Sequence, residues 1–264
     1  SSMAVLDEFA DPEELARITE EIFRDLKGQM ASPPKVAEVG VVRTRIPRLD
    51  EVLGGGIPQG HIVLMAGTPG TMKSSLVYYM LYNMAKENGT TCVYVTLEQS
   101  RNSLLRQMEK MGMRTEDVKQ NLHVLDLGLI RKNLRHAAGG ESWMQVFKGY
   151  LSSLKNDMNF NVIAIDSLGV LETISDMSNR RTDLFYLFEW LRDLNSTVFM
   201  ISEVSSDRLF EGAYDEGYLA DGIITLKMQV VREVETQRRI RCVKMRETNH
   251  DPSYYSLLFS GCRF

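Results

Sequence analysis

The strongest constraint on the fold is a regular alternation of short apolar segments with longer amphipathic ones, which begins at Val41. Short apolar runs without interspersed polar residues are typical of strands covered on both faces, whereas the longer segments have helical lengths and periods. Such alternation predicts an α/β fold, with a mostly parallel sheet and helices on both of its faces. The expected strands are HIVLMAG, CVYVTLE, LHVLDL, NVIAIDS and TVFMISE, and the expected helices run to Asn88, from Ser100, around 143–154 and around 184–194.

The pattern changes near both ends of the chain. After Leu219 only strand-like segments remain, ADGIITLKM, RRIRCVKMR and YYSLLFS, which predicts antiparallel C-terminal strands. Near the start, Asp11 and Pro12 favour the beginning of a helix whose apolar stripe, including Ile18 and Ile22, must pack on its own domain or on a neighbouring subunit. Consecutive prolines in ASPPKVAEVG then favour an extended linker. We therefore expect a helical extension and linker in residues 1–40 and one domain in residues 41–264.

The composition narrows the class of protein. A hydrophobic content of 44% and a net charge of −4 describe an ordinary globular chain and argue against a general basic surface for duplex DNA. Cys92, Cys242 and Cys262 are too scattered for a disulfide framework or a four-ligand zinc site, which suits a reducing cytoplasm. No apolar run approaches the roughly 20 residues that span a bilayer. The sequence therefore predicts a cytoplasmic protein without a membrane span.

The segment GTPGTMKSS, residues 67–75, differs by one residue from the phosphate-binding pattern G-x-x-x-x-G-K-[ST]. It lies between an expected strand and an expected helix, which is the context that this motif requires. Backbone amides of such a loop bind a polyphosphate, Lys73 neutralises phosphate oxygens, and the Ser74 hydroxyl is a ligand for Mg²⁺. We therefore predict an ATP and Mg²⁺ site whose nucleotide contacts are Thr68, Pro69, Gly70, Thr71, Met72, Lys73, Ser74 and Ser75.

The one departure from the motif is Met72, which stands where the pattern has its second glycine. A backbone with positive φ at this position would cost methionine on the order of 1–2 kcal/mol, whereas a helical φ would cost little. Because Met72 directly precedes the Lys-Ser pair that opens the helix, we expect a helical φ with the amide directed at the phosphate.

Three acidic residues end expected strands and are candidates for the same site. Asp166 ends VIAIDS, where a parallel sheet places its ligand crevice, and is expected to hold the magnesium ion together with Ser74. Glu98 ends CVYVTLE and is the candidate base for the attacking water. Glu203 ends TVFMISE and is a candidate sensor of the γ-phosphate.

Several segments together resemble the KaiC-like branch of the RecA-type P-loop ATPases, with relatives among archaeal RadA-like and GvpD-like proteins. The segments are RTRIPRLDEVLGGGIPQGHIVLMAGTPGTMKSSL, YVTLEQSRNSLLRQMEKMG, VIAIDSLGVL, LADGIITL and KMRETNHD, which extend from about Val41 to the C-terminus. Their order and spacing are far more specific than a phosphate loop alone. The resemblance implies a RecA-like core that hydrolyses ATP.

The resemblance also implies roles for residues outside the phosphate loop. In KaiC-like proteins two acids close the second strand and the first is the base; this chain has Glu98 followed by Gln99, which implies slow hydrolysis. A Lys-x-Arg pair in the family reaches the nucleotide of the adjacent subunit, and it corresponds to Lys244 and Arg246. Thr248 and His250 are then further contacts to that nucleotide. Residues that act between subunits imply a homo-oligomeric ring, which we expect to be a hexamer.

Three other functions remain open from the sequence. An autokinase would use Ser175, Ser178 or Thr182 as acceptor, in the loop region after the Asp166 strand. A recombinase-like filament would bind single-stranded DNA through Arg180, Arg181 and Arg208, although the acids of EGAYDEG and the acidic balance of the chain disfavour nucleic acid. A nucleotide-binding scaffold without turnover would follow if Met72 and Gln99 together disable the site. The first expectation is a regulatory ATPase that acts on an unknown protein partner.

Overall fold

The computed structural model describes residues 12–31, 39–128, 142–175, 177–205 and 217–264. The chain divides into two compact units, residues 1–39 and 40–264. The first contains helix α1, Pro12–Ala31, which carries Glu13 and Glu14 in its first turn and leaves Ile18, Ile22, Phe23 and Leu26 exposed. Asp11, the expected cap, and most of the expected linker lie outside the described residues. The surface on which the apolar stripe of α1 packs stays a prediction.

The second unit is built on an eight-stranded sheet with the order β10-β9-β8-β3-β7-β6-β4-β5. The strands from β5 to β8 in this order are parallel, and β9 and β10 are antiparallel additions at one edge. The α/β prediction and the antiparallel C-terminal strands are thereby confirmed. The bounds are β3 Ile62–Gly67, β4 Cys92–Thr96, β5 Leu122–Asp126, β6 Val162–Asp166, β7 Thr197–Glu203, β8 Gly222–Arg232, β9 Glu235–Met245 and β10 Tyr255–Ser256.

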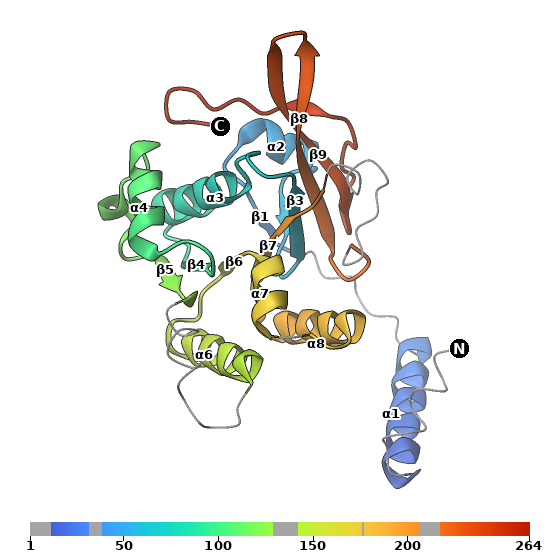
Figure 1. The fold of residues 1–264 in the computed structure, drawn as a ribbon. Coiled ribbons are helices and arrows are strands. Elements are labelled where there is room, and N and C mark those ends of the chain that lie inside the picture. The colour runs from blue at the N-terminus through green and yellow to red at the C-terminus, as the bar shows by residue number, and fades with distance from the viewer. Residues whose placement is uncertain (1–11, 32–38, 129–141, 176, 206–216) are drawn as a thin grey trace. The chain divides into compact units, whose positions relative to one another are not determined.

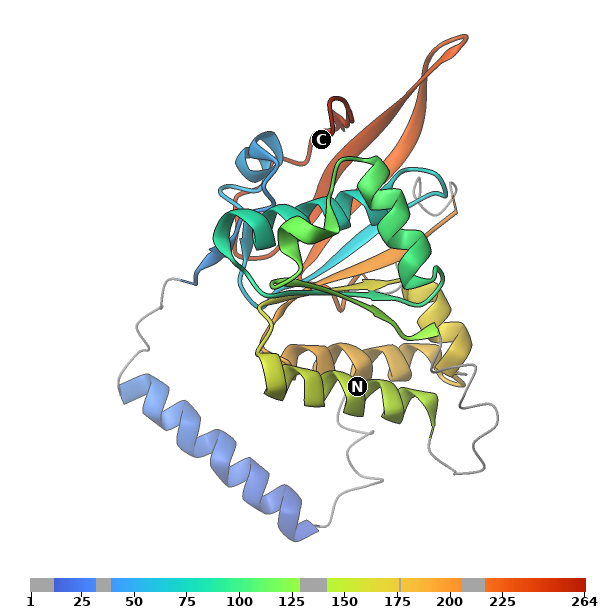
Figure 2. The same ribbon diagram turned by 90° about the vertical axis from the view of Figure 1, so that its left-hand side faces the viewer.

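Helices cover both faces of this sheet, with α3 and α4 on one face and α6 and α8 on the other (Figure 2). Each face has its own apolar core, and the strand residues alternate between the two cores, which is why the strands read as uninterrupted apolar runs. The helices are α2 Pro47–Val52, α3 Lys73–Asn88, α4 Arg101–Lys110, α6 Trp143–Met158, α7 Leu168–Ser175 and α8 Arg180–Asp193, with a 3-10 turn at Thr115–Val118. A small separate sheet pairs β1 Val41–Val42 with β2 Ile57–Pro58.

Local chemistry explains where the helices begin and end. Ser100, where the sequence predicted the start of a helix, caps α4 by accepting a hydrogen bond from the Ser103 backbone, and Ser142 forms a reciprocal capping box with Gln145 at the start of α6. Gly89 ends α3 in a left-handed conformation at φ 63°. Helix α7 and the early start of α8 at Arg180 were not predicted from the sequence.

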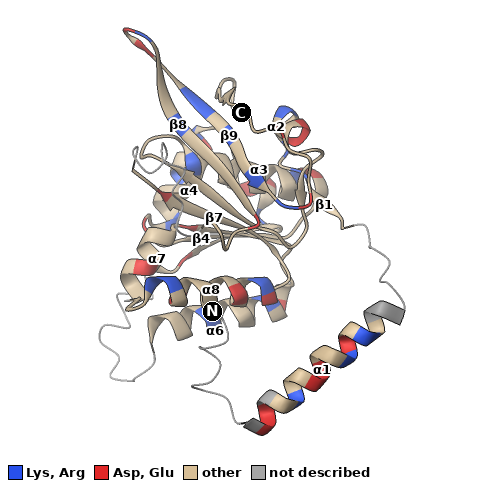
Figure 3. Cartoon of the chain, turned by 90° about the vertical axis from the view of Figure 1, so that its right-hand side faces the viewer, with Lys and Arg blue, Asp and Glu red and all other residues tan. Residues whose placement is uncertain are grey.

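The last two long strands form a hairpin that extends beyond the rest of the sheet (Figure 1). Strand β8 runs parallel to β3, with Gly222 opposite Val63 and Leu226 opposite Gly67, and continues to Arg232. Lys and Arg residues recur along both strands of the hairpin (Figure 3). Among the described residues, no helix has the length and apolar character needed to cross a membrane.

Candidate functional site

The segment that resembles a phosphate loop connects the end of β3 to the start of α3, as predicted. Gly67 ends the strand, and a Cβ atom there would lie 2.6 Å from the Leu226 carbonyl oxygen of β8, so a larger residue does not fit. Gly70 has φ 78° and bends the loop. The loop residues Thr68, Pro69, Gly70, Thr71 and Met72 therefore precede Lys73, Ser74 and Ser75, which form the first turn of α3.

The expected backbone conformation of Met72 is wrong. Met72 has φ 66° and ψ 29°, which is the left-handed conformation that the glycine of the motif adopts without cost. The reason is its place as the residue before the first helical turn, where the chain still completes the bend into α3. Its carbonyl already accepts a hydrogen bond from the Leu76 amide at 2.9 Å. The methionine side chain lines the cavity beside the loop, so the substitution strains the backbone and leaves the cavity open.

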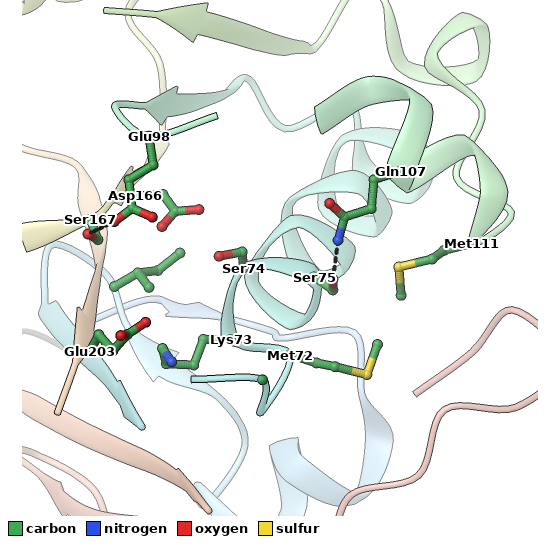
Figure 4. Close-up of a pocket in the computed structure, with 12 residues that line it drawn as sticks. Met72, Lys73, Ser74, Ser75, Glu98, Gln107, Met111, Asp166, Ser167 and Glu203 are labelled. Carbon is green, nitrogen blue, oxygen red and sulfur yellow. Dashed lines mark hydrogen bonds between the residues drawn. The ribbon is translucent and has the colours of Figure 1, made fainter. Parts of the chain in front are cut away.

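A cavity of about 320 Å³ lies at the carboxyl ends of the central strands. It brings together Lys73, Ser74, Glu98, Asp166 and Glu203 from four different segments of the chain, as Figure 4 shows. The sequence predicted each of these residues at a strand end or in the loop, and the parallel order of β3, β7, β6 and β4 places them side by side.

Lys73 is the cation of this cavity. Its side chain is buried, and its ammonium donates a hydrogen bond to the Thr68 carbonyl oxygen at 2.8 Å. Burial lowers the pKa of Lys73, while the negative charges of Glu203, Asp166 and Glu98 act in the opposite direction. The buried ammonium of Lys73 can bind phosphate oxygens of a nucleotide. A cation bound with the nucleotide would offset the negative charge of the three surrounding acids.

Asp166 is held by hydrogen bonds inside the protein. The hydroxyl of Tyr94 on β4 donates to its Oδ2 atom at 2.6 Å. Burial raises the pKa of Asp166 above its usual range, and the hydrogen bonds from Tyr94 and Ser74 oppose that rise. Burial, and then the neighbouring Asp166 charge, raise the pKa of the Tyr94 phenol well above its ordinary value, so the phenol is a proton donor at neutral pH.

Glu98 and Glu203 both line the cavity (Figure 4). The hydroxyl of Ser167 donates to the Glu98 Oε1 atom at 2.6 Å, which restrains the orientation of this carboxylate and leaves its Oε2 atom available to accept another hydrogen bond. Glu203 ends β7 beside Gly67, at the entrance of the loop. The arrangement suits Glu98 for orienting a water molecule.

Gln99 does not take the place of a second acid in the cavity. Its side-chain amide donates to the Ser103 hydroxyl at 2.9 Å and to the Gln107 Oε1 atom at 3.2 Å. Gln107 in turn donates to the Ser75 hydroxyl at 3.5 Å, as drawn in Figure 4. The two neutral glutamines therefore join the end of β4 to helix α3 through Ser75. A carboxylate in place of Gln99 would add negative charge at the end of β4.

The residues of the cavity fit a magnesium nucleotide. A hydroxyl and a carboxylate, from Ser74 and Asp166, are the hard oxygen donors that Mg²⁺ binds, directly or through water. Lys73 and the start of α3 face the same volume and suit phosphate oxygens.

The sequence predicted a second group, Lys244 and Arg246, which lies at the opposite end of the sheet. Met245 pairs with Gly222, and Gly222 pairs with Val63 at the start of β3, whereas the phosphate loop follows the end of β3. The backbone carbonyl of Arg246 is 3.2 Å from the ring of His61, the residue before β3. These two basic side chains therefore do not join the cavity of their own chain.

Both cations are anchored at this end by the turn that precedes β8. The Lys244 ammonium donates to the carbonyl oxygens of Gly217 at 3.0 Å and Ala220 at 2.7 Å, and Arg246 pairs with the buried Asp221 at 3.1 Å. Burial would raise the pKa of Asp221, but its hydrogen bond with Arg192 and the other donors lower it overall. Burial, and then the positive charge of Arg246, lower the pKa of Lys244.

Thr248 and His250 follow these cations in the chain. The Thr248 hydroxyl donates weakly to the Met245 carbonyl oxygen at 3.4 Å. The Nδ1 atom of His250 is buried and has no hydrogen-bond partner among the described residues. A polar atom of this kind is costly to bury and favours a partner from outside the described chain.

Several of the residues considered for other functions contact other parts of the protein. Ser175 donates to the Leu171 carbonyl oxygen at 2.5 Å, and the Thr182 amide is held by the Asn179 cap of α8. Ser178 lies in the turn before α8. Arg180 pairs with Glu172 at 2.6 Å and Arg181 lies 5.2 Å from the Tyr218 ring, while Arg208 is outside the described residues.

Sequence reasoning missed several residues that line or support the cavity. Tyr94 carries a hydroxyl on a strand covered on both faces, and a buried phenol must find an acceptor, which is a signal that the sequence offered. Ser167 follows Asp166 directly, and a serine after a strand carries no local signal of its contact with Glu98. The other missed lining residues, Gln107, Met111 and Ile201, reach the cavity only through tertiary packing and gave no signal.

Comparison with known proteins gives consistent results. A family model described as "ATPase: KaiC" matches residues 42–260. A UPF0273 protein from Aeropyrum pernix is 31% identical over 79% of this chain and 86% of its own length, and one from Methanocaldococcus jannaschii is 30% identical over 79% and 88%. The circadian clock protein KaiC2 of Synechocystis is 27% identical over 81% of this chain and 38% of its own length. The solved structure of a KaiC-like protein from Pyrococcus horikoshii superposes with a TM-score of 0.70, at 26% identity, over 84% of this chain and 96% of that one.

Proposed function

Because the chain belongs to the KaiC family of ATPases, we propose that it is a homo-oligomeric, Mg²⁺-dependent ATPase with its nucleotide shared between neighbouring copies. Residues 41–264 form the ATPase domain of this proposal, and residues 1–40 form an extension. The observation that carries the proposal is the separation of two charged groups: the loop and its acids lie at one end of β3, and Lys244 and Arg246 lie at the other.

The chemistry at the loop end follows from the residues of one chain. The loop amides and Lys73 bind the phosphates, and Ser74 and Asp166 hold the magnesium ion, which when bound would offset phosphate charge. Glu98, oriented by Ser167, accepts a proton from the attacking water. The neutral Gln99 beside it leaves Glu98 as the single acid at this strand end, so we expect slow turnover.

The opposite end of the sheet supplies what the loop end lacks. A guanidinium and an ammonium that meet the γ-phosphate stabilise the charge that develops there, and Arg246 and Lys244 have this chemistry. Their own cavity is beyond reach, so they act on the nucleotide of the next copy, with Thr248 and His250 as further contacts. A head-to-tail contact of this kind closes into a ring, which we propose to be a hexamer.

Slow hydrolysis in a ring suits regulation of a protein partner through a change in the ring's shape. The proposal is tested by the size of the particle with and without ATP and Mg²⁺, measured by light scattering. We expect ATP and Mg²⁺ to assemble the 30.1 kDa chain into a six-membered particle that hydrolyses ATP. A particle that remains a monomer with full turnover would contradict a shared site.

The same preparation distinguishes the other functions. Intact mass after incubation with ATP would gain one phosphate if the protein were an autokinase, and turnover would rise with single-stranded DNA if it were a recombinase. We expect neither change.

A further inference from the structure

Tyr94 is a buried polar residue that the chemistry described above does not use. It lies in the middle of β4, its side chain is completely buried, and its ring packs edge-on against Tyr78 of α3 at a centroid distance of 5.5 Å. Its hydroxyl reaches the next strand and donates to Asp166 at 2.6 Å. One side chain therefore connects β4, β6 and the helix that follows the phosphate loop.

The sheet register explains why this contact forms. The Cα atom of Tyr94 is paired with that of Ala164, two residues before Asp166 on the neighbouring strand, so Tyr94 and Asp166 share one face of the sheet. The methyl group of Ala164 leaves room for the ring to extend along the strand toward the carboxylate. A larger side chain at Ala164 would occupy that room.

The hydrogen bond from Tyr94 restricts the rotation of the Asp166 carboxylate. Tyr94 occupies Oδ2 on the protein side, so the carboxylate is fixed with its remaining acceptor positions toward Ser74 and the cavity. A carboxylate at the end of a strand has rotational freedom that must be lost when it holds a metal ion or its water shell. Fixing the rotation in advance reduces that loss.

We propose that Tyr94 is a positioning residue that presents the Asp166 carboxylate to the magnesium ion of the bound nucleotide. The inference rests on the proposed function, because it assumes that Asp166 serves a magnesium nucleotide. It adds a residue that acts through Asp166 and does not touch the nucleotide.

The test is the Mg²⁺ dependence of ATP binding by Tyr94→Phe, measured by titrating Mg²⁺ against a fluorescent ATP analogue. Removal of the hydroxyl should raise the half-saturating Mg²⁺ concentration about tenfold, as is typical when a hydrogen bond to a metal ligand is lost. Affinity for the analogue in EDTA should stay at the wild-type value. Tyr78→Phe is the matched control, because it removes a hydroxyl from the same core, and it should leave the Mg²⁺ dependence unchanged.

A second variant separates positioning from packing. In an Asp166→Asn background, Tyr94→Phe should have no further effect on the Mg²⁺ dependence, because the residue through which it acts is already altered. An unchanged Mg²⁺ dependence in Tyr94→Phe alone, or an equal loss of binding in EDTA, would overturn the inference and leave the proposed function intact. Wild-type protein that binds the analogue equally with Mg²⁺ and with EDTA would overturn both.

Discussion

The two ends of β3 carry two separate groups of charged residues. At the carboxyl end, a loop, a buried lysine and three acids surround a cavity of about 320 Å³. At the amino end, Lys244 and Arg246 are anchored on the turn before β8, and Arg246 is half exposed. The first group lines a cavity with no arginine among its described residues, and the second holds an arginine and a lysine outside that cavity.

The direction of the strands explains why the two groups lie apart. Strand β8 runs parallel to β3 and β9 returns antiparallel, so the hairpin delivers its last residues to the end opposite the phosphate loop. The topology therefore keeps Lys244 and Arg246 away from the cavity of their own chain. In the proposed function a second copy placed head to tail supplies these residues, and each prediction below alters one end while leaving the other unchanged.

The largest effect is expected at the loop end from Glu98→Gln. The substitution keeps the shape of the side chain and its contact with Ser167 but removes the base, so turnover should fall by about 10²–10⁴ while ATP affinity stays near wild type. Steady-state ATPase and titration with a fluorescent ATP analogue measure the two quantities. Glu109→Gln, on the exposed face of α4, is the matched control. Unchanged turnover in Glu98→Gln would remove this residue from the mechanism.

A smaller effect is expected at the opposite end from Arg246→Ala. In the proposed function the Arg246 guanidinium stabilises the negative charge that develops on the γ-phosphate in the transition state. Its loss should lower turnover about a hundredfold, as the loss of one oxyanion-hole donor does in other enzymes. Arg106→Ala, an exposed arginine on α4, should retain activity. Because Arg246 also pairs with Asp221, the unfolding temperature of both variants is measured in parallel. Full activity in a folded Arg246→Ala protein would confine the chemistry to the loop end.

The smallest effect concerns the strained residue of the loop. Met72→Gly should stabilise the protein by about 0.5–1 kcal/mol. Glycine adopts the left-handed conformation without strain, and this gain exceeds the free energy lost because glycine has more conformational entropy in the unfolded chain. Met72→Ala keeps the strain at φ 66° and should not stabilise it. Thermal unfolding of the two variants gives the comparison. A glycine variant that is less stable than the alanine variant would show that the backbone at this position carries no strain.

Much of the fold and of the loop end was predictable, for identifiable reasons. The uninterrupted apolar runs fixed the strands, and an acid at the end of a buried parallel strand must lie at the carboxyl edge of the sheet, which placed Glu98, Asp166 and Glu203 together. The start of α4 beside Ser100 followed from the change of pattern after CVYVTLE. These features depend on local pattern and on the direction of the strands.

The rest depends on tertiary structure. The conformation of Met72 is set by the bend between β3 and α3, which overrides the preference of methionine for helical dihedral angles. The contact of Tyr94 with Asp166 depends on the register between β4 and β6, and the anchoring of Lys244 depends on carbonyl oxygens of a turn more than 20 residues earlier. Neither register nor turn position is encoded in a short stretch of sequence.

The most direct measurement of the divided site is the ATPase activity of a mixture of Glu98→Gln and Arg246→Ala chains. If the two ends meet between copies, about a quarter of the interfaces in an equimolar mixture join an intact loop end to an intact Arg246, and activity should rise to about that fraction of wild type. Each variant alone remains nearly inactive. A mixture no more active than the average of the two separate variants would contradict the account.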